Sequence, residues 1–194
     1  MIESICVYCG SNPGFDPAFR AAAISLGTEI GRRGQRLVYG GSHLGMMGAL
    51  ADAVLAAGGK VTGVMPGLLV DKEAAHRGLS ELRVVNSMHE RKMLMADLAD
   101  GFVSLPGGYG TLDETFEIAA WAQLGLHAKP VVLWNVSGFY DPLFTFLDGI
   151  VSAGLLRPQH RALIRQAQTL DEVFARLAEP VEASGGKWLP GDLR

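Results

Sequence analysis

The chain has 194 residues, of which 48% are hydrophobic, enough for one well-buried core and too few for two ordinary domains. Its formal net charge is −3 and no run of Lys or Arg occurs, so the basic footprint of a nucleic-acid-binding protein is missing and small ligands are the expected partners. No apolar run reaches the roughly 20 residues of a membrane span, and the first residues do not spell a signal peptide, so we expect a cytoplasmic protein that does not bind membranes.

Short apolar runs alternate with helix-length amphipathic stretches along most of the chain. In chain order, the expected strands are Ser4–Cys9, Arg36–Tyr39, Lys60–Met65, Leu82–Val85, Gly101–Leu105 and Pro130–Trp134. The expected helices are Ala18–Arg32, Leu44–Ala57, Met88–Ala99, Leu112–Leu124, Pro142–Ser152 and Leu170–Leu177. Strands that alternate with helices are joined by right-handed crossovers. The prediction is therefore a single α/β domain with a Rossmann-like doubly wound parallel sheet and helices on both faces.

No internal repeat and no interior linker divides the chain. We expect the nucleotide-monophosphate-binding domain to span residues 1–178 and a mobile C-terminal tail to follow at residues 179–194. The longest irregular connection is Pro66–Ser80. Because long ordered loops often cover binding sites, this connection is a candidate for ligand contacts.

The two cysteines, Cys6 and Cys9, spell a C-x-x-C redox motif. The two residues between them continue an apolar strand, however, and three extended residues separate the Cα atoms by about 10 Å, beyond disulfide reach. We therefore expect free thiols in a reducing compartment, with a redox module as the alternative.

Three glycine-containing turns follow predicted strands, at residues 9–14, 39–48 and 106–110. In open parallel sheets, ligands bind beyond the carboxyl ends of the strands, where helix N-termini attract anions. A tight strand-to-helix connection would explain any one of these turns, but three at one edge favour a phosphate site, above all in the third turn before Thr111. The P-loop and the G-x-G-x-x-G spacing are both absent, which argues against nucleoside triphosphate hydrolysis and NAD chemistry.

The helix after the third turn carries two carboxylates on one face. Thr111 and Glu114 spell a capping box, with Thr111 as the N-cap, and capping alone would explain both residues. Glu117 lies one turn further on, and like charges at this spacing destabilise a helix by roughly a few tenths of a kcal/mol unless a cation or ligand hydroxyls offset them. With Trp121 on the same face, a carboxylate pair beside a phosphate turn fits acid/base or cation-stabilising chemistry.

The preceding helix carries an arginine on its apolar side. Ser87 and Glu90 spell another capping box, which predicts that the helix begins directly after Ser87. The apolar stripe expected to face inward consists of Met88, Met95, Leu98 and Ala99. Arg91 falls inside this stripe, so unless its guanidinium reaches solvent it needs a carboxylate such as Glu114 or a phosphate as its partner. Lys92 adds a second positive charge.

Other catalytic patterns are missing from the sequence. The five histidines show no metal-ligand spacing, and no G-x-S-x-G elbow indicates a Ser-His-Asp hydrolase. We therefore expect neither a metal nor a cofactor.

On these residues the chain resembles the Lonely Guy family, the phosphoribohydrolases that release cytokinin bases from their riboside 5′-monophosphates. The similarity spans roughly residues 5–177. Its most specific parts are residues 88–92, the P-G-G-x-G-T-x-x-E motif at residues 106–114 and residues 121–125. The family's older label, lysine decarboxylase, has no support here, because nothing marks a lysine as a Schiff-base site for pyridoxal phosphate.

The resemblance implies a hydrolase that cleaves the N-glycosidic bond of a nucleoside 5′-monophosphate, either cytokinin riboside 5′-monophosphate or AMP, to free base and ribose 5-phosphate. It also implies a homodimer with the site near the subunit interface, Arg91 and Glu114 as the catalytic pair, and Glu117 in support. Glu114 would stabilise the oxocarbenium-like state as the base departs. The expected substrate contacts are Ser11, Gly41, Glu73, Met88, Lys92, Gly107, Gly108, Tyr109, Gly110 and Thr111.

Two positions depart from the family pattern. Ser42 stands where a third glycine is usual in the second turn, and Ala120 stands where plant relatives carry a ligand-contacting threonine. Adenine and N6-prenyl adenine therefore both stay open as the base. The main alternative function is a nucleotide sensor or molybdenum-cofactor carrier, because the same fold and phosphate turn occur without hydrolysis.

Overall fold

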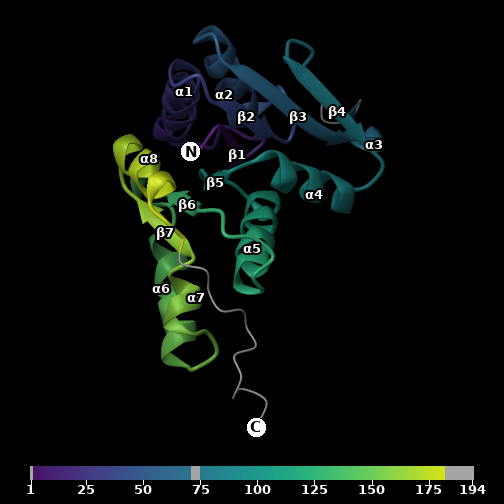
Figure 1. Cartoon of the computed structure of the whole chain (residues 1–194). Coiled ribbons are helices and arrows are strands. Elements are labelled where there is room, and N and C mark those ends of the chain that lie inside the picture. The colour runs from purple at the N-terminus through teal and green to yellow at the C-terminus, as the bar shows by residue number, and fades with distance from the viewer. Residues whose placement is uncertain (1, 71–74, 182–194) are drawn as a thin grey trace.

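The computed structural model describes residues 2–70 and 75–181, which form one α/β domain with a seven-stranded parallel sheet between helices (Figure 1). The strands are β1 (Ser4–Tyr8), β2 (Arg36–Tyr39), β3 (Lys60–Pro66), β4 (Glu81–Val85), β5 (Gly101–Ser104), β6 (Val131–Trp134) and β7 (Ile164–Ala167). The helices are α1 (Pro17–Arg32), α2 (Gly45–Ala56), α3 (Gly67–Val70), α4 (Met88–Leu98), α5 (Tyr109–Gln123), α6 (Asp141–Ser152), α7 (Pro158–Arg161) and α8 (Leu170–Ala178), with a 3-10 turn η1 (Val136–Gly138) before α6. The predicted doubly wound parallel sheet is confirmed.

The strand order is β4-β3-β2-β1-β5-β6-β7, so the direction of winding reverses between β1 and β5. There Ile5 pairs with Gly101 and Tyr8 with Ser104. In open α/β sheets the loops after two such strands diverge to opposite faces and leave a crevice, which is where ligands bind. The topology therefore predicts a ligand site at the carboxyl ends of β1 and β5.

Strand β1 shows how the sheet is held between its two layers of helices. Ile5 and Val7 belong to the core cluster shared with α1, α2 and α8. Cys6 and Tyr8 point the other way, into the cluster shared with α4, α5 and α6. Because successive side chains of a strand alternate between faces, a run that is apolar at every position is buried on both sides.

Some elements were not expected from the sequence: β7, the two short helices α3 and α7, and η1. β7 is an edge strand, and two of its four residues, Arg165 and Gln166, are polar and only half buried. Arg165 donates hydrogen bonds to the carbonyl oxygens of Arg176, Glu179 and Pro180, so it satisfies the end of α8.

The predicted long connection between residues 66 and 80 contains the end of β3 and the short helix α3, and residues 71–74 within it lie outside the described residues. Most of the expected C-terminal tail, residues 182–194, also lies outside them. Among the helices of residues 2–70 and 75–181, none is long and apolar enough to cross a membrane.

Candidate active site

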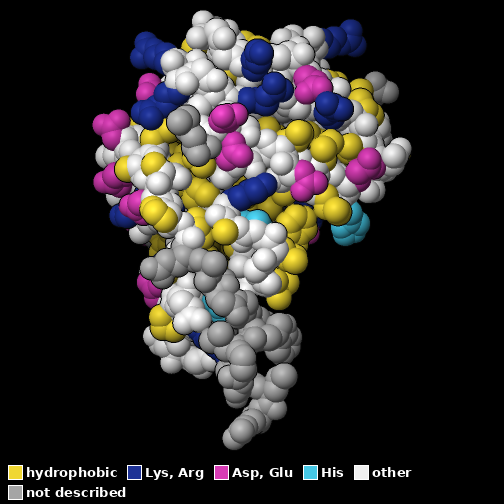
Figure 2. Space-filling view, viewed as in Figure 1, with side chains coloured by type: hydrophobic (Ala, Val, Ile, Leu, Met, Phe, Trp, Pro, Cys, Tyr) yellow, Lys and Arg dark blue, Asp and Glu magenta, His cyan; other side chains and the backbone are white. Residues whose placement is uncertain are grey.

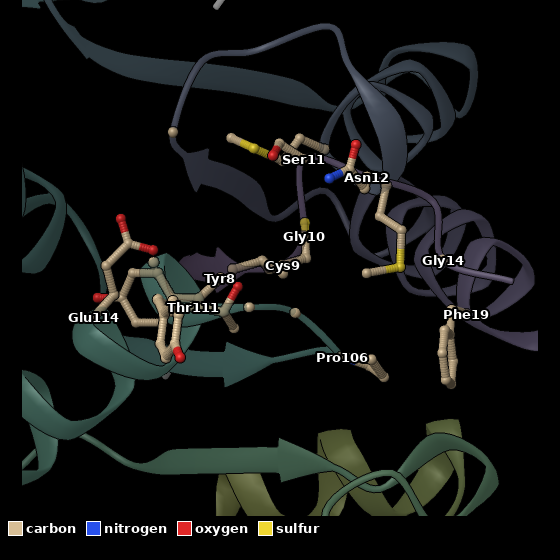
Figure 3. Close-up of a pocket in the computed structure, with 18 of the residues that line it drawn as sticks. Tyr8, Cys9, Gly10, Ser11, Asn12, Gly14, Phe19, Pro106, Thr111 and Glu114 are labelled. Atoms are coloured by element: carbon tan, nitrogen blue, oxygen red, sulfur yellow. The ribbon is translucent and has the colours of Figure 1, made fainter. Parts of the chain in front are cut away.

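A cavity of about 420 Å³ lies at the carboxyl ends of β1, β2 and β5, at the switch point of the sheet. The three glycine turns, the first turns of α2 and α5, and side chains of α1 and α4 form its walls. Figure 3 shows Glu114 and Thr111 toward one end of the cavity and Phe19 at the other. The predicted site residues that line it are Ser11, Arg91, Glu114 and residues 107–111.

The first and third glycine turns are packed directly against each other. The amide of Gly10 donates to the carbonyl oxygen of Pro106 at 3.1 Å. A Cβ on Gly107 would collide with the side-chain oxygen of Thr111 and lie 2.9 Å from the amide nitrogen of Gly10. Glycine is required at this position because the two backbones approach too closely for any side chain.

Helix α5 begins earlier than the sequence suggested. Its first residue is Tyr109 and its N-cap is Gly108, without a side-chain hydrogen bond, so the prediction that Thr111 caps this helix is wrong. Thr111 is instead a buried residue of the first turn. The glycines before it let the chain enter the helix sooner, and the amides at the helix start lie at the cavity wall without an N-cap side chain to accept from them.

A chain of buried hydroxyl groups fixes that first turn to the sheet. The hydroxyl of Thr115 donates to the carbonyl oxygen of Thr111 at 2.6 Å. The Ser104 hydroxyl on β5 lies 2.6 Å from the same Thr115 oxygen. All three residues are buried, so the orientation of the α5 amides is tied to the end of β5.

Helix α2 presents a second start at the cavity. Its N-cap, Leu44, also makes no side-chain hydrogen bond, whereas Asp16, Ser87 and Thr169 cap α1, α4 and α8 with their side chains. Met46 and Met47, in the first turn of α2, line the cavity. Two helix starts without a side-chain cap, each with the positive end of a helix dipole, therefore border one cavity, an arrangement that attracts an anion such as phosphate.

Arg91 and Glu114 meet beside these turns. The Nη1 atom of Arg91 lies 3.5 Å from Oε1 of Glu114, and their side chains are only 9% and 11% exposed. Arg91 Nε also donates to the carbonyl oxygen of Val64 on β3 at 3.1 Å. A carboxylate is therefore one partner of Arg91, as the sequence suggested, and both charged groups also line the cavity.

A second ion cluster joins α4 to α5 beside this pair. Lys92 Nζ lies 3.0 Å from a carboxylate oxygen of Glu117 and 3.2 Å from one of Asp113. Burial alone would lower the pKa of the Lys92 ammonium, but its hydrogen bonds with these two carboxylates raise the pKa above its ordinary value. The repulsion expected between Glu114 and Glu117 is thus offset by one cation each, Arg91 and Lys92.

Four predicted site residues lie outside the cavity lining: Gly41, Met88, Lys92 and Glu117. Gly41 has a positive φ of 85°, and its carbonyl oxygen accepts from the amide of His76. Met88 is 41% exposed, so the prediction that it faces inward is wrong. Its sulfur instead lies 3.9 Å from Arg91 Nη1. Glu73 lies outside the described residues.

Sequence reasoning did not assign Phe19 or Phe139 to the site, although both line the cavity. Phe19 lies on α1 and Phe139 follows η1, and their rings meet edge to face at 5.5 Å. No motif marked either residue, because only the tertiary packing of distant segments brings them together. Tyr8, directly before the first turn, also lines the cavity, as do Cys9 and Gly40, which belong to two of the recognised turns.

Two lining residues with acidic protons are held in their neutral form. Burial raises the pKa of the Tyr8 hydroxyl and of the Cys9 thiol, and the nearby charge of Glu114 raises both further. Cys6 and Cys9 are free cysteines, and burial also raises the pKa of Cys6. Neither thiol is a nucleophile in this state, since the thiolate is the reactive form.

Within residues 2–70 and 75–181, no group of three His, Cys, Asp or Glu residues is placed to hold a metal ion.

Comparisons with known proteins fit this geometry. A family model described as "Possible lysine decarboxylase" matches residues 47–177. The probable cytokinin riboside 5′-monophosphate phosphoribohydrolase LOGL9 of Oryza sativa subsp. japonica is 50% identical, covering 91% of this chain and 78% of the relative. The enzyme named LOG from the same plant is 48% identical, covering 91% of this chain and 73% of the relative.

Among solved structures, a molybdenum cofactor binding protein from Rippkaea orientalis is 19% identical with a TM-score of 0.67, covering 90% of this chain and 94% of that one. At that identity the likeness concerns the fold alone.

Proposed function

The chain belongs to the Lonely Guy family, the family of the cytokinin riboside 5′-monophosphate phosphoribohydrolases, and on this premise we propose that it hydrolyses a nucleoside 5′-monophosphate. The bond broken is the N-glycosidic bond, and the products are the free base and ribose 5-phosphate. The substrate class is a cytokinin riboside 5′-monophosphate, with AMP as the unmodified counterpart. The observation that carries the proposal is the buried Arg91–Glu114 pair in the wall of a cavity bordered by two uncapped helix starts.

The phosphate binds at the glycine turns in this proposal. The amides at the start of α5, beside Gly107 and Gly108, supply donors without a negative side chain to compete for them. Binding energy from the phosphate orients the ribose, so that the reacting bond is held against the catalytic groups. This assigns to residues 107–111 the anchoring of the substrate and not the chemistry itself.

Glu114 carries the chemistry. Cleavage of an N-glycosidic bond develops positive charge on the ribose ring, and a carboxylate in a cavity of low polarity stabilises that charge strongly. Arg91 holds the Glu114 carboxylate by the ion pair and faces the cavity, where its guanidinium also contacts the phosphate or ribose. A water molecule that Glu114 orients then adds its hydroxyl to the anomeric carbon, and its other proton goes to the departing nitrogen of the base, so that free base and ribose 5-phosphate are formed.

The assembly we propose is a homodimer. Exposed apolar side chains concentrate on α4 and α5, which carry the catalytic pair, and Figure 2 shows apolar side chains over these helices. The exposed residues on or next to them are Met88, Met93, Tyr109, Phe116, Leu124 and Leu126. Exposed apolar side chains beside the site support a protein interface there. The free Cys6 and Cys9 thiols support a reducing compartment such as the cytoplasm.

The proposal is tested by incubating the purified protein with AMP and, separately, with N6-prenyl AMP. Chromatography should detect free base and ribose 5-phosphate in equal amounts, and the ratio of kcat/KM for the two substrates identifies the preferred base. Tight binding of either nucleotide without product formation would contradict hydrolysis and would favour a carrier. Size-exclusion chromatography with light scattering measures the oligomeric state in the same preparation.

A further inference from the structure

Gly40 directly follows β2 and lines the cavity together with Arg91 and Glu114. Unlike Gly41 beside it, Gly40 does not adopt a positive φ, so its own backbone would accept alanine. What excludes a side chain is the surroundings. A Cβ at this position would collide with Nη2 of Arg91 and would lie 2.6 Å from the terminal methyl of Met47.

The guanidinium that occupies this space is held on two other sides. Its Nε donates to the Val64 carbonyl oxygen at 3.1 Å, and its Nη1 lies 3.5 Å from Glu114. The third nitrogen, Nη2, lies against the bare Cα of Gly40. The guanidinium group is planar and its donors are fixed in one fork, so a push on Nη2 also displaces Nη1, the nitrogen that pairs with Glu114.

Other glycines of the second turn are required for a different reason. A Cβ on Gly48 would collide with the backbone carbonyl of His43, and a Cβ on Gly45 would collide with that of Ser11. These backbone carbonyl groups cannot move away without disturbing the fold. At Gly40 the colliding atoms are the ends of two flexible side chains, which can move without a shift of the backbone.

We propose that Gly40 is a positioning residue for catalysis: the absence of its side chain lets the Arg91 guanidinium lie where it holds Glu114. The expected loss of activity rests on the proposed function, whereas the expected displacement of Arg91 rests on geometry alone. A methyl group at position 40 leaves the protein folded and displaces Arg91 from the ion pair.

The first test is Gly40→Ala, with Gly149→Ala as the matched control. Gly149 lies in α6, and a Cβ there meets nothing within 4 Å. We expect Gly40→Ala to unfold cooperatively, at a lower Tm because a buried ion pair is disrupted, and to lower kcat about 100-fold, because a displacement of about 1 Å at a catalytic group has effects of that size. Gly149→Ala should retain wild-type kcat. A Gly40→Ala protein that does not unfold cooperatively, or one with wild-type kcat, would overturn the inference.

The second test separates Arg91 from a general disturbance of the site. Adding Gly40→Ala to Arg91→Lys should change kcat less than about threefold, since the guanidinium that clashes is already gone. A further loss of about 100-fold in that background would show that Gly40 acts through something other than Arg91. Combining Gly40→Ala with Met47→Ala addresses the remaining contact. Recovery of kcat to the level of Met47→Ala alone would assign the effect to Met47 and overturn the inference.

A crystal structure of Gly40→Ala provides a readout that does not depend on the substrate. We expect Arg91 Nη1 to lie beyond ion-pair distance of Glu114. An intact ion pair would overturn the inference even if the enzyme acts on nucleotides as proposed. If the wild-type protein releases no base, a displaced guanidinium in Gly40→Ala would still support the inference, while the proposed function would be contradicted.

Discussion

The N-termini of α4 and α5 carry the same sequence pattern and use it in opposite ways. In α4, the Glu90 amide donates to the Ser87 hydroxyl at 3.1 Å, and the Glu90 carboxylate accepts from the Asn86 amide at 2.8 Å. In α5, the corresponding residues Thr111 and Glu114 lie inside a helix that already began at Tyr109. The Glu90 carboxylate closes a cap in α4, whereas the Glu114 carboxylate in α5 pairs with Arg91.

This difference shows what an omitted cap can provide. A side-chain cap satisfies the first amides of a helix and stabilises the fold, but it also occupies the position where an anion would bind. In α5 the glycines before the helix move its start upstream, so the amides and Glu114 are both left for the cavity. One helix thus uses the pattern as a cap, whereas in its neighbour the same residue types line the cavity.

The largest difference between the two helices is expected when each glutamate is replaced by glutamine. Glu114→Gln keeps the shape of the side chain but removes its charge, so kcat for release of free base should fall at least about 100-fold. Glu90→Gln is the control and should keep kcat within about twofold, because a glutamine oxygen can still accept in a capping box. Near-normal turnover by Glu114→Gln would remove Glu114 from catalysis.

Lys92→Met tests the second link between the helices. Without the ammonium, Asp113 and Glu117 repel each other and Glu114 on one helix face, so α5 shifts relative to α4 and kcat should fall about tenfold while KM changes little. Arg33→Met, which removes an exposed ion pair with Glu29 on α1, should leave both constants unchanged. A rise in KM at constant kcat would show instead that Lys92 binds the substrate directly.

Thr115→Val removes the buried hydroxyl that ties the first turn of α5 to β5. We expect the KM for the nucleotide to rise about fivefold, because one lost hydrogen bond of roughly 1 kcal/mol loosens the phosphate-binding turn. Thr145→Val on α6 is a matched control, since Thr145 also donates to the carbonyl four residues earlier but is exposed. Equal KM values for the two variants would contradict the anchoring role.

Ser87→Ala breaks the cap of α4 and should affect stability alone. The expected loss is about 1 kcal/mol in the free energy of unfolding, measured by urea denaturation, with kcat/KM within about twofold of wild type. Thr169→Ala, which removes the equivalent cap of α8, should have a similar effect. A large loss of activity in Ser87→Ala would mean that the start of α4 is itself part of the site.

The smallest effect concerns Asp100, which lies away from both helix starts. Burial, the largest single influence, would raise the pKa of its carboxyl, but hydrogen bonds from the Glu3 and Ser4 amides and the Ser4 hydroxyl lower it below the ordinary value of 3.8. A lowered folded-state pKa contributes stability above pH 3.8 that is lost as the pH falls through the folded value. The urea midpoint of the wild type should therefore fall more between pH 5 and pH 3 than that of Asp100→Asn. Equal pH dependence would contradict this role.

Periodicity and turn chemistry were sufficient to predict most of the fold. Six strands and six helices were expected close to where they lie, because apolar runs buried on both faces are easy to recognise. β7 was not predicted because an edge strand with Arg165 and Gln166 at its centre has no apolar run. The start of α5 was misplaced because local capping rules do not include the glycine turn that precedes it.

The candidate site was predicted in part. Arg91 was recognisable because a charge in an apolar stripe needs a partner, and Glu114 because a second acid follows it at helical spacing. The pairing of Lys92 with Glu117 and the positions of Phe19 and Phe139 depend on how α4, α5, α1 and η1 pack. Those contacts join segments far apart in the chain, and no local pattern encodes them.

The reversal of the sheet between β1 and β5 has a consequence for the nascent chain. Ile5 of β1 pairs with Leu37 of β2 on one side and with Gly101 of β5 on the other. During synthesis the first edge can be covered early, whereas the second stays open until β5 has left the ribosome. For that interval an apolar strand has unpaired backbone groups on one side, which makes it a target for chaperones and for mispairing with another chain.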